Sequence, residues 1–287
     1  MYSKRVFRTE SQAVFGEYNK NSSNPITTMF EVMRDTAFQK HPYKHTTMGF
    51  LRDIVKMPRQ YEYSQSFFKR WYKPEYITIL VVGDVEHDDV WRLTNQYFGK
   101  WKKGTHTVEI PAEPPQSKPL TCHVPWRTPT QPWVGVAFHG PAFSPKNKDM
   151  PTLDVLSSVA FSPSSELYKK LFVTERKVDV IFSHFPDHKD PYLLMVFARV
   201  KKAEDLGYVR DQILSTCESM KTKSISDKRL ADVKARAQQF HRQVFLNPAR
   251  PLPSGKSHGG EMIQLASFIN CMPVDKDLCA SICKQIE

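Results

Sequence analysis

The chain has 287 residues and a formal net charge of +11 from 41 basic and 30 acidic side chains, and its 40% hydrophobic and 25% charged residues are typical of a soluble globular protein. This length favours two domains over a single core. The sequence contains no apolar run that could span a membrane, no signal-peptide pattern, and too few, too scattered cysteines for a secreted disulfide framework.

The first predicted element is a helix over residues 9–20, which carries Glu10 and Glu17. Seven residues make two helical turns, so both carboxylates lie on one face, about 10 Å apart along the axis. Ala13 and Val14 share that face, which predicts a half-buried helix edge. A buried carboxylate is costly unless it is paired or binds a metal. On spacing alone, two solvated glutamates are the favoured alternative.

Further elements follow as far as the first proline-rich stretch. Asn24 is predicted to cap a helix that has Pro25 at its first position. Helices are expected over 47–56 and 60–72, a buried strand over Ile77–Asp84, and another helix to about Phe98. Residues 105–118 hold several prolines and no sustained apolar period, which predicts a semi-rigid linker between two domains.

The pattern of helices and strands begins again after this linker. The expected strands are residues 132–139, 177–183 and 192–200, and the expected helices are residues 149–159, 164–172, 204–220 and 226–245. The strands over 177–183 and 192–200 are expected to pair with each other.

Several motifs in the first half occur in a fixed order. They are G-E-Y-N-K-N (Gly16–Asn21), E-V-M-R-D-T-A-F (Glu31–Phe38), H-P-Y-K-H-T-T-M-G-F (His41–Phe50), F-F-K-R-W-Y-K-P (Phe67–Pro74), V-V-G-D (Val81–Asp84) and Y-F-G-K-W (Tyr97–Trp101). Together they resemble the pitrilysin/insulinase family of zinc metallopeptidases, which includes the mitochondrial processing peptidases. The resemblance covers residues 7–104 closely and continues more loosely through residues 162–171 and 187–193.

The resemblance implies an α+β fold of two related domains, each a mainly antiparallel sheet with helices packed on one face, the first incomplete at its N-terminus. Residues 1–104 would be the C-terminal portion of the zinc-bearing peptidase domain and 105–118 the linker. Residues 119–287 would be the second domain, which carries no zinc in this family, and we expect it to stop short of its last strand.

The family's zinc site combines an H-x-x-E-H helix with a glutamate from a later helix. By resemblance, Glu17 is that third protein ligand, and Glu10 supports the site from two turns earlier. Zinc is therefore the implied cofactor of the full-length protein. Only sixteen residues precede Glu17, so the histidine helix does not fit upstream of it. We therefore expect this isolated chain to hold zinc weakly or not at all, and to be inactive.

Two histidine pairs within the chain imitate the spacing of the zinc motif. His184 and His188 enclose a proline, which breaks a helix, and the segment lies between two predicted strands. His41 and His45 enclose a proline and no acid. Both pairs are therefore interpreted as connecting segments and not as metal ligands.

The sequence is compatible with three functions. The first is part of a zinc endopeptidase that acts on unfolded peptides or short polypeptides. The second is a non-catalytic, substrate-binding or structural subunit beside an active peptidase, whose partners would be a second copy of the chain or a complementary subunit. The third is a nucleic-acid binder recruited by the positive charge. Because the lysines are spread in pairs and no recognition module is present, we expect neither a nucleic-acid nor a membrane partner.

Overall fold

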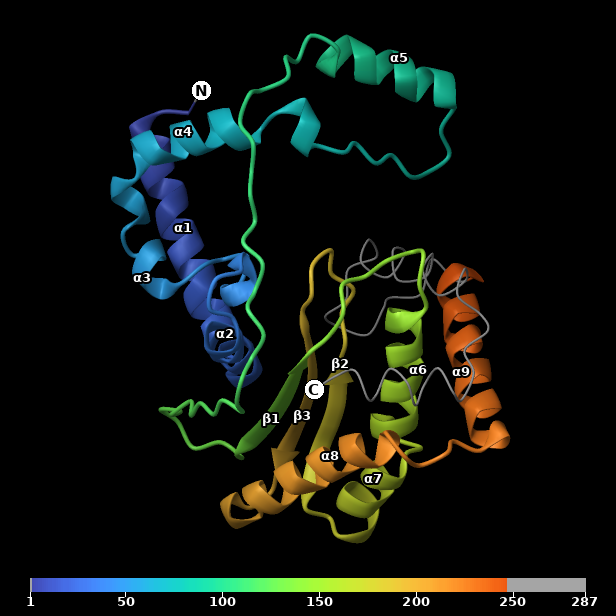
Figure 1. The fold of residues 1–287 in the computed structure, drawn as a ribbon. Coiled ribbons are helices and arrows are strands. Elements are labelled where there is room, and N and C mark those ends of the chain that lie inside the picture. The colour runs from blue at the N-terminus through green and yellow to red at the C-terminus, as the bar shows by residue number, and fades with distance from the viewer. Residues whose placement is uncertain (1, 247–287) are drawn as a thin grey trace. The chain divides into compact units, whose positions relative to one another are not determined.

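The computed structural model describes residues 2–246, and the chain divides into two compact units, Met1–Val124 and Pro125–Glu287. In the first unit the described elements are α1 (Lys4–Ser22), α2 (Pro25–Ala37), η1 (Pro42–Lys44), α3 (Leu51–Ile54), η2 (Met57–Arg59), α4 (Tyr61–Trp71), η3 (Pro74–Tyr76) and α5 (His87–Phe98). In the second they are β1 (Trp133–His139), α6 (Asp149–Phe161), α7 (Glu166–Tyr168), η4 (Lys169–Thr174), β2 (Val178–His184), β3 (Leu193–Val200), η5 (Ala203–Asp205), α8 (Leu206–Met220) and α9 (Asp227–Leu246). Figure 1 shows their course along the chain.

Most of the predicted helices are confirmed within a few residues. The start of α2 follows the expected capping chemistry, since the Asn24 side chain accepts a hydrogen bond from the Ile26 backbone N–H at 3.0 Å and Pro25 is the first helical residue. The helix ends before Phe38, whose side chain is almost fully buried. None of the helices in residues 2–246 combines the length and apolar character needed to cross a membrane.

The first unit is assembled around α1, which contacts α2, α3 and α4. An aromatic cluster joins its N-terminal end to α4, where the Phe7 ring lies 5.8 Å from that of Tyr61 and 6.0 Å from that of Tyr2. Phe7 is buried, so this contact fixes one face of α1 against the rest of the unit. Aromatic pairs at these separations add to the stabilisation that comes from burial alone.

The predicted buried strand at Ile77–Asp84 is not formed. The described part of the first unit, residues 2–124, contains no strand, so the sheet expected in this domain is not formed there. A lone extended segment has no partner for its backbone N–H and C=O groups, and it therefore remains in water. Its side chains are exposed accordingly, with Leu80 at 78% and Val82 at 68%.

The apolar exposure continues into α5. Trp91 is 70% exposed and Tyr97 is 72% exposed, although both belong to a clearly amphipathic helix. Single exposed apolar residues are ordinary, whereas a run of them marks a surface that another element covers. We call Ile77–Val82 together with these two α5 aromatics the apolar stretch.

The predicted linker is held against the first unit by its own polar contacts. The Glu113 carboxylate accepts hydrogen bonds from the backbone N–H groups of Gln39, Lys40 and His41 at 2.6, 2.9 and 2.8 Å. Just before the linker, the Gly104 N–H donates to a Glu75 carboxylate oxygen at 2.8 Å. The chain after α5 is therefore held against the rest of the first unit at Gly104 and at Glu113.

In the described part of the second unit, residues 125–246, a three-stranded antiparallel sheet has the order β1-β3-β2. Phe197 of the central strand β3 pairs with Gly135 of β1 and with Phe182 of β2, whose ring stacks on it at 5.3 Å. All three strands were predicted, and the small antiparallel sheet with packed helices confirms an α+β fold.

Helices cover one face of this sheet. Val209 and Ile213 of α8 are fully buried against Val196, Ala198 and Val200 of β3. α6 lies next to β2, and α9 lies against the outer side of α6 (Figure 1). The interface between α6 and α9 buries Val155 of α6 against Leu230 and Val233 of α9.

The turn between η4 and β2 has a strained residue at its centre. η4 is a π-helical turn in which the Glu175 N–H donates to the Lys170 carbonyl at 2.8 Å, and the Lys177 N–H donates to the Leu171 carbonyl at 2.9 Å. Between these bonds Arg176 has a φ of 54°, the left-handed conformation that glycine usually supplies at a helix end.

Candidate functional site

Helix α1 carries both predicted site residues, Glu10 and Glu17. The helix begins after Ser3, whose hydroxyl accepts a hydrogen bond from the Val6 N–H at 3.3 Å. Both glutamates are exposed and lie two turns apart on one face, as their spacing predicts. The structure therefore brings the two acids onto a common, accessible side of the helix.

The prediction that this face is half-buried is wrong in one respect, because Ala13, between the two glutamates, is exposed. The inward side of α1 lies further around the helix, where Phe7 and Ser11 are buried and Val14 and Tyr18 are half-buried. The Ser11 hydroxyl donates to the Phe7 carbonyl at 2.7 Å, which satisfies the polar group inside this contact.

Glu17 offers a carboxylate oxygen to a metal, but the rest of a ligand set is not assembled around it. Among the described residues, no group of three or more His, Cys, Asp or Glu side chains is placed to hold a metal ion. A catalytic zinc site needs three protein ligands and an open position. The described residues therefore fit zinc only in part, with Glu17 as one donor.

The two histidine pairs lie where the sequence predicts connecting segments. His184 ends β2, and His188 follows in the loop before β3 with its ring 3.8 Å from the Tyr192 ring. His41 caps the short turn η1 and accepts a hydrogen bond from the Tyr43 N–H at Nδ1, 3.1 Å away. These rings serve local structure.

Sequence reasoning missed a polar contact next to Glu17. The Tyr18 hydroxyl lies 3.0 Å from each carboxylate oxygen of Glu31, which belongs to α2. Burial, followed by this hydrogen bond and by the charge of Glu31, raises the pKa of Tyr18 to about 12. The contact ties α1 to α2 one residue after the predicted zinc ligand. A tyrosine at the end of a buried helical stripe was the available signal, because its hydroxyl needs a partner.

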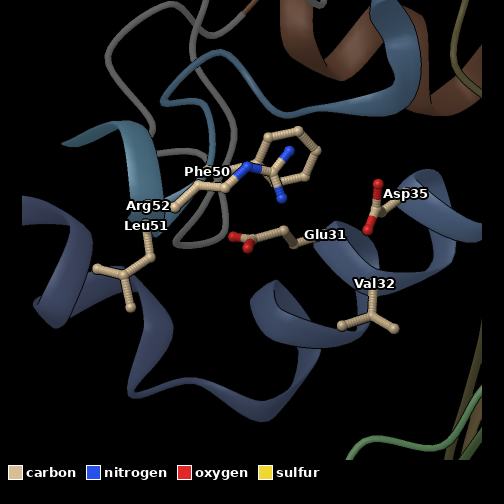
Figure 2. Close-up of a pocket in the computed structure, with 6 residues that line it drawn as sticks. All are labelled: Glu31, Val32, Asp35, Phe50, Leu51 and Arg52. Carbon is tan, nitrogen blue, oxygen red and sulfur yellow. The ribbon is translucent and has the colours of Figure 1, made fainter. Parts of the chain in front are cut away.

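Glu31 also lines an open pocket of about 410 Å³ in the first unit (Figure 2). Its lining residues are Glu31, Val32, Asp35, Phe50, Leu51 and Arg52. Asp35 lies one turn after Glu31 on α2 and forms an ion pair with Lys44, with 3.0 Å between Oδ1 and Nζ. The Arg52 guanidinium lies 4.0 Å from the centre of the Phe50 ring. The pocket thus combines two carboxylates, an aromatic face and one cation.

The fold defines the class of this protein, and comparison with known proteins defines its family. The class is that of α+β proteins in which helices cover one face of a small antiparallel sheet. The family model described as "Peptidase M16 inactive domain" matches residues 60–237. The chain therefore belongs to the peptidase M16 family, that of pitrilysin and insulinase, which confirms the resemblance seen in the sequence.

Individual relatives agree with this assignment. The chain is 28% identical to "Zinc protease PqqE" of Helicobacter pylori over 233 residues, a region that makes up 79% of this chain and 52% of that protein. The chain thus spans about half the length of this curated relative. Two mycobacterial relatives, each 27% identical over 90 residues, are also named zinc proteases.

Solved structures with the same fold include a protease and a chain of a larger complex. A protease from Helicobacter pylori superposes with a TM-score of 0.81 at 22% identity, covering 99% of this chain and 70% of that chain. A chain of Complex III2 from Candida albicans superposes with a TM-score of 0.71 at 15% identity, covering 96% of this chain and 67% of that chain. At these identities the likeness establishes the fold alone.

Proposed function

We propose that this chain is part of a zinc-dependent endopeptidase that acts on unfolded peptides or short polypeptides. The family match over residues 60–237 carries the proposal. The name of the Helicobacter pylori relative supports the zinc and protease parts of it. In this reading residues 1–104 belong to the zinc-bearing domain, 105–118 connect the domains, and 119–287 form the second domain, which carries no zinc.

Within the zinc-bearing domain, Glu17 is proposed as the third protein ligand and Glu10 as the residue that supports the site. Zinc, once bound, lowers the pKa of a bound water and polarises the peptide carbonyl. Glu17 would contribute one anionic oxygen from the exposed face of α1. Glu10, about 10 Å along the same face, is too distant to share that ion and would act on neighbouring groups.

Because the printed sequence contains no H-x-x-E-H motif, we expect the isolated chain to be inactive. One carboxylate retains little of the affinity of a three-ligand site. Residues 77–84 are proposed to become a strand of the first domain's sheet when the histidine-bearing part of the domain is present, which would give two related domains.

The first test is the intact mass of the natural protein, captured from its own cells with an antibody against this chain. A mass well above 33.2 kDa, with an H-x-x-E-H peptide upstream of α1, is expected. A mass equal to this chain, with no zinc-dependent peptidase activity in the captured material, would overturn the proposal.

The site assignment is tested in that longer protein by two variants. Glu17→Gln should lower bound zinc and abolish most peptide cleavage, whereas Glu10→Gln should have a smaller effect, about 10- to 100-fold, through ligand orientation. Glu86→Gln, another acidic residue of the first unit that lies outside α1, is the matched control. Equal losses from Glu10→Gln and Glu17→Gln would undo the assignment of ligand and supporting residue.

The alternative is a non-catalytic subunit of a peptidase complex. Its support is the "inactive domain" description of the matching family model and the fold shared with a chain of Complex III2. In that case the natural chain would have a mass near 33.2 kDa and would be captured together with a separate chain that carries the complete zinc motif.

A further inference from the structure

We propose that the backbone N–H groups of Gln39, Lys40 and His41 form a carboxylate-binding site, which Glu113 of the predicted linker occupies in this structure. A carboxylate of another polypeptide would bind there when Glu113 leaves, and the linker would then be released from the first unit at this point. All four residues belong to the first unit, and none of them is the predicted zinc ligand or lines the pocket beside α2. The inference is therefore independent of the proposed function.

Three consecutive N–H groups converge on one carboxylate. The Gln39 N–H donates to one Glu113 oxygen at 2.6 Å, and the N–H groups of Lys40 and His41 donate to the other oxygen at 2.9 and 2.8 Å. These lengths are close to those of charge-assisted hydrogen bonds. Successive N–H groups that point to one side form a concavity that binds anions. The loop therefore has the geometry of an anion receptor, with a carboxylate in place.

This receptor is a loop and not the end of a helix. The short turn η1 begins after it at Pro42, which has no N–H group. The N–H groups of Tyr43 and Lys44 both donate to His41, at 3.1 Å to Nδ1 and at 3.0 Å to the carbonyl oxygen. The donors of η1 are thus satisfied within the turn itself, and the three N–H groups that bind Glu113 precede it.

Contacts on the other side of the loop hold its shape. The Lys44 ammonium donates to the carbonyl oxygens of Asp35 and Phe38 at 2.8 and 3.0 Å. Phe38 is 1% exposed, and its ring lies 5.9 Å from the Tyr43 ring. A receptor that already has its binding shape loses little conformational entropy when a ligand arrives. We therefore expect the three N–H groups to keep their arrangement when the Glu113 side chain is removed.

Apolar burial contributes little to the attachment of the linker at this point. Pro111, Ala112 and Pro115 are all exposed on either side of Glu113. The attachment therefore rests mainly on the polar contacts of the Glu113 carboxylate. Because Glu113 is tethered to the unit that it binds, a carboxylate from outside has to compete with it. Removal of the Glu113 side chain should open the site to such a ligand.

The experiment uses the full chain without zinc, as the variant Glu113→Ala, and follows its backbone amides by NMR during titration with acetate. Acetate supplies the atoms that this substitution removes. Saturable shifts at Gln39, Lys40 and His41 are expected, and hydrogen exchange of these amides should slow by about tenfold or more. Acetamide, which has nearly the same shape and no charge, should do neither. No saturable shift with acetate, or equal shifts with acetamide, would overturn the proposal.

Two proteins that retain Glu113 test whether this residue is the occupant. They are the parent chain and Glu109→Ala, which removes an exposed acid of the same linker. In both, the midpoint of the acetate titration at residues 39–41 should be higher by about tenfold or more, because the tethered carboxylate competes. Equal midpoints with and without Glu113 would show that acetate binds elsewhere, which contradicts the proposal.

Release of the linker is measured separately from occupation of the site. In Glu113→Ala, the amide of Ala112 should gain mobility on the picosecond to nanosecond timescale, as measured by NMR relaxation. Acetate should leave Ala112 mobile while it protects residues 39–41. If acetate also ordered Ala112, its effect would be a general stabilisation of the fold, and the assignment of a local site would be wrong.

Two further probes distinguish the sources of the carboxylate. N-acetylalanine carries the carboxylate of a chain end, and N-acetylglutamate α-amide carries that of an acidic side chain. Tighter binding of the first to Glu113→Ala would assign the site to peptide C-termini, and tighter binding of the second to acidic segments. Failure of both to shift the three amides would overturn a polypeptide ligand. Because no step needs zinc or peptide cleavage, these titrations and the mass experiment succeed or fail independently.

Discussion

The carboxylate of Glu113 accepts the backbone N–H of Gln39 at a distance of 2.6 Å, across more than seventy residues of sequence. The next two N–H groups, of Lys40 and His41, point to the other oxygen of the same carboxylate. Three successive donors that converge on one anion form a rigid anchor, since charge-assisted hydrogen bonds are about twice as strong as neutral ones.

Removing this anchor should expose the three amides. In Glu113→Ala, hydrogen exchange at Gln39, Lys40 and His41 should accelerate by about tenfold or more, because a hydrogen bond to a charged group contributes about 1.5–3 kcal/mol. Native-state exchange measured by NMR checks this. Glu109→Ala, an exposed acid of the same segment, should leave the three amides protected. Unchanged exchange in the Glu113 variant would show that other contacts hold the segment.

Glycine at position 176 should stabilise the second unit. Arg176 has a φ of 54° at the end of η4, and its exposed side chain adds little burial. Relief of the left-handed strain should raise the free energy of unfolding by about 0.5–1 kcal/mol, measured by urea denaturation. The matched control, Arg210→Gly within α8, should lower it by about 1 kcal/mol. Destabilisation by Arg176→Gly would mean that contacts of the arginine side chain stabilise the fold by more than the relief of backbone strain does.

Alkaline pH should reveal the Tyr18–Glu31 contact. With its pKa raised to about 12, the folded chain keeps the Tyr18 proton more tightly than the unfolded chain does. The contribution of this hydrogen bond is therefore fully present below about pH 10 and is lost as the pH rises toward about 12.

Tyr18→Phe should consequently be less stable than the parent by about 1 kcal/mol or more near pH 9, and this difference should shrink near pH 11. Urea unfolding of both proteins at the two pH values measures it. Tyr72→Phe, an exposed tyrosine of the same unit, should give the same small difference at both. A Tyr18→Phe difference that stays constant with pH would refute the coupling.

The apolar stretch should drive self-association of the isolated chain. Leu80 and Trp91 are 78% and 70% exposed, and exposed runs of this kind pair with other copies. Sedimentation velocity should show oligomers for the parent and mainly monomer for the Leu80→Glu/Trp91→Glu variant. Val173→Glu, at an exposed apolar residue of the second unit, should not change the distribution. A monodisperse parent monomer would count against the prediction.

Local patterns in the sequence were sufficient to predict most of the helices and strands. The Asn24-Pro25 start of α2 is confirmed because capping depends on neighbouring residues alone. The three strands of the second unit are confirmed because they find one another within that unit. Ile77–Asp84 has the same composition as those strands, but composition does not supply a neighbour, and strand formation depends on one.

The candidate site likewise has features that the local sequence predicts and features that depend on packing between helices. The common face of Glu10 and Glu17 follows from helical periodicity within one element. The Tyr18–Glu31 bond and the pocket that includes Arg52 depend on how α1, α2 and α3 pack, and such packing has no local signature. The roles of Glu10 and Glu17 at zinc remain predictions to be tested in the longer protein.

The strand order of the second unit has a consequence for the way this chain is made. β3, the last of the three strands to be synthesised, is the one that pairs with both others. β1 and β2 leave the ribosome first and share no ladder, so their edges stay open until β3 emerges. We expect the sheet to form only once β3, the most buried strand, is available to both. A pause in translation before Leu193 would prolong the period in which chaperones have to shield these edges.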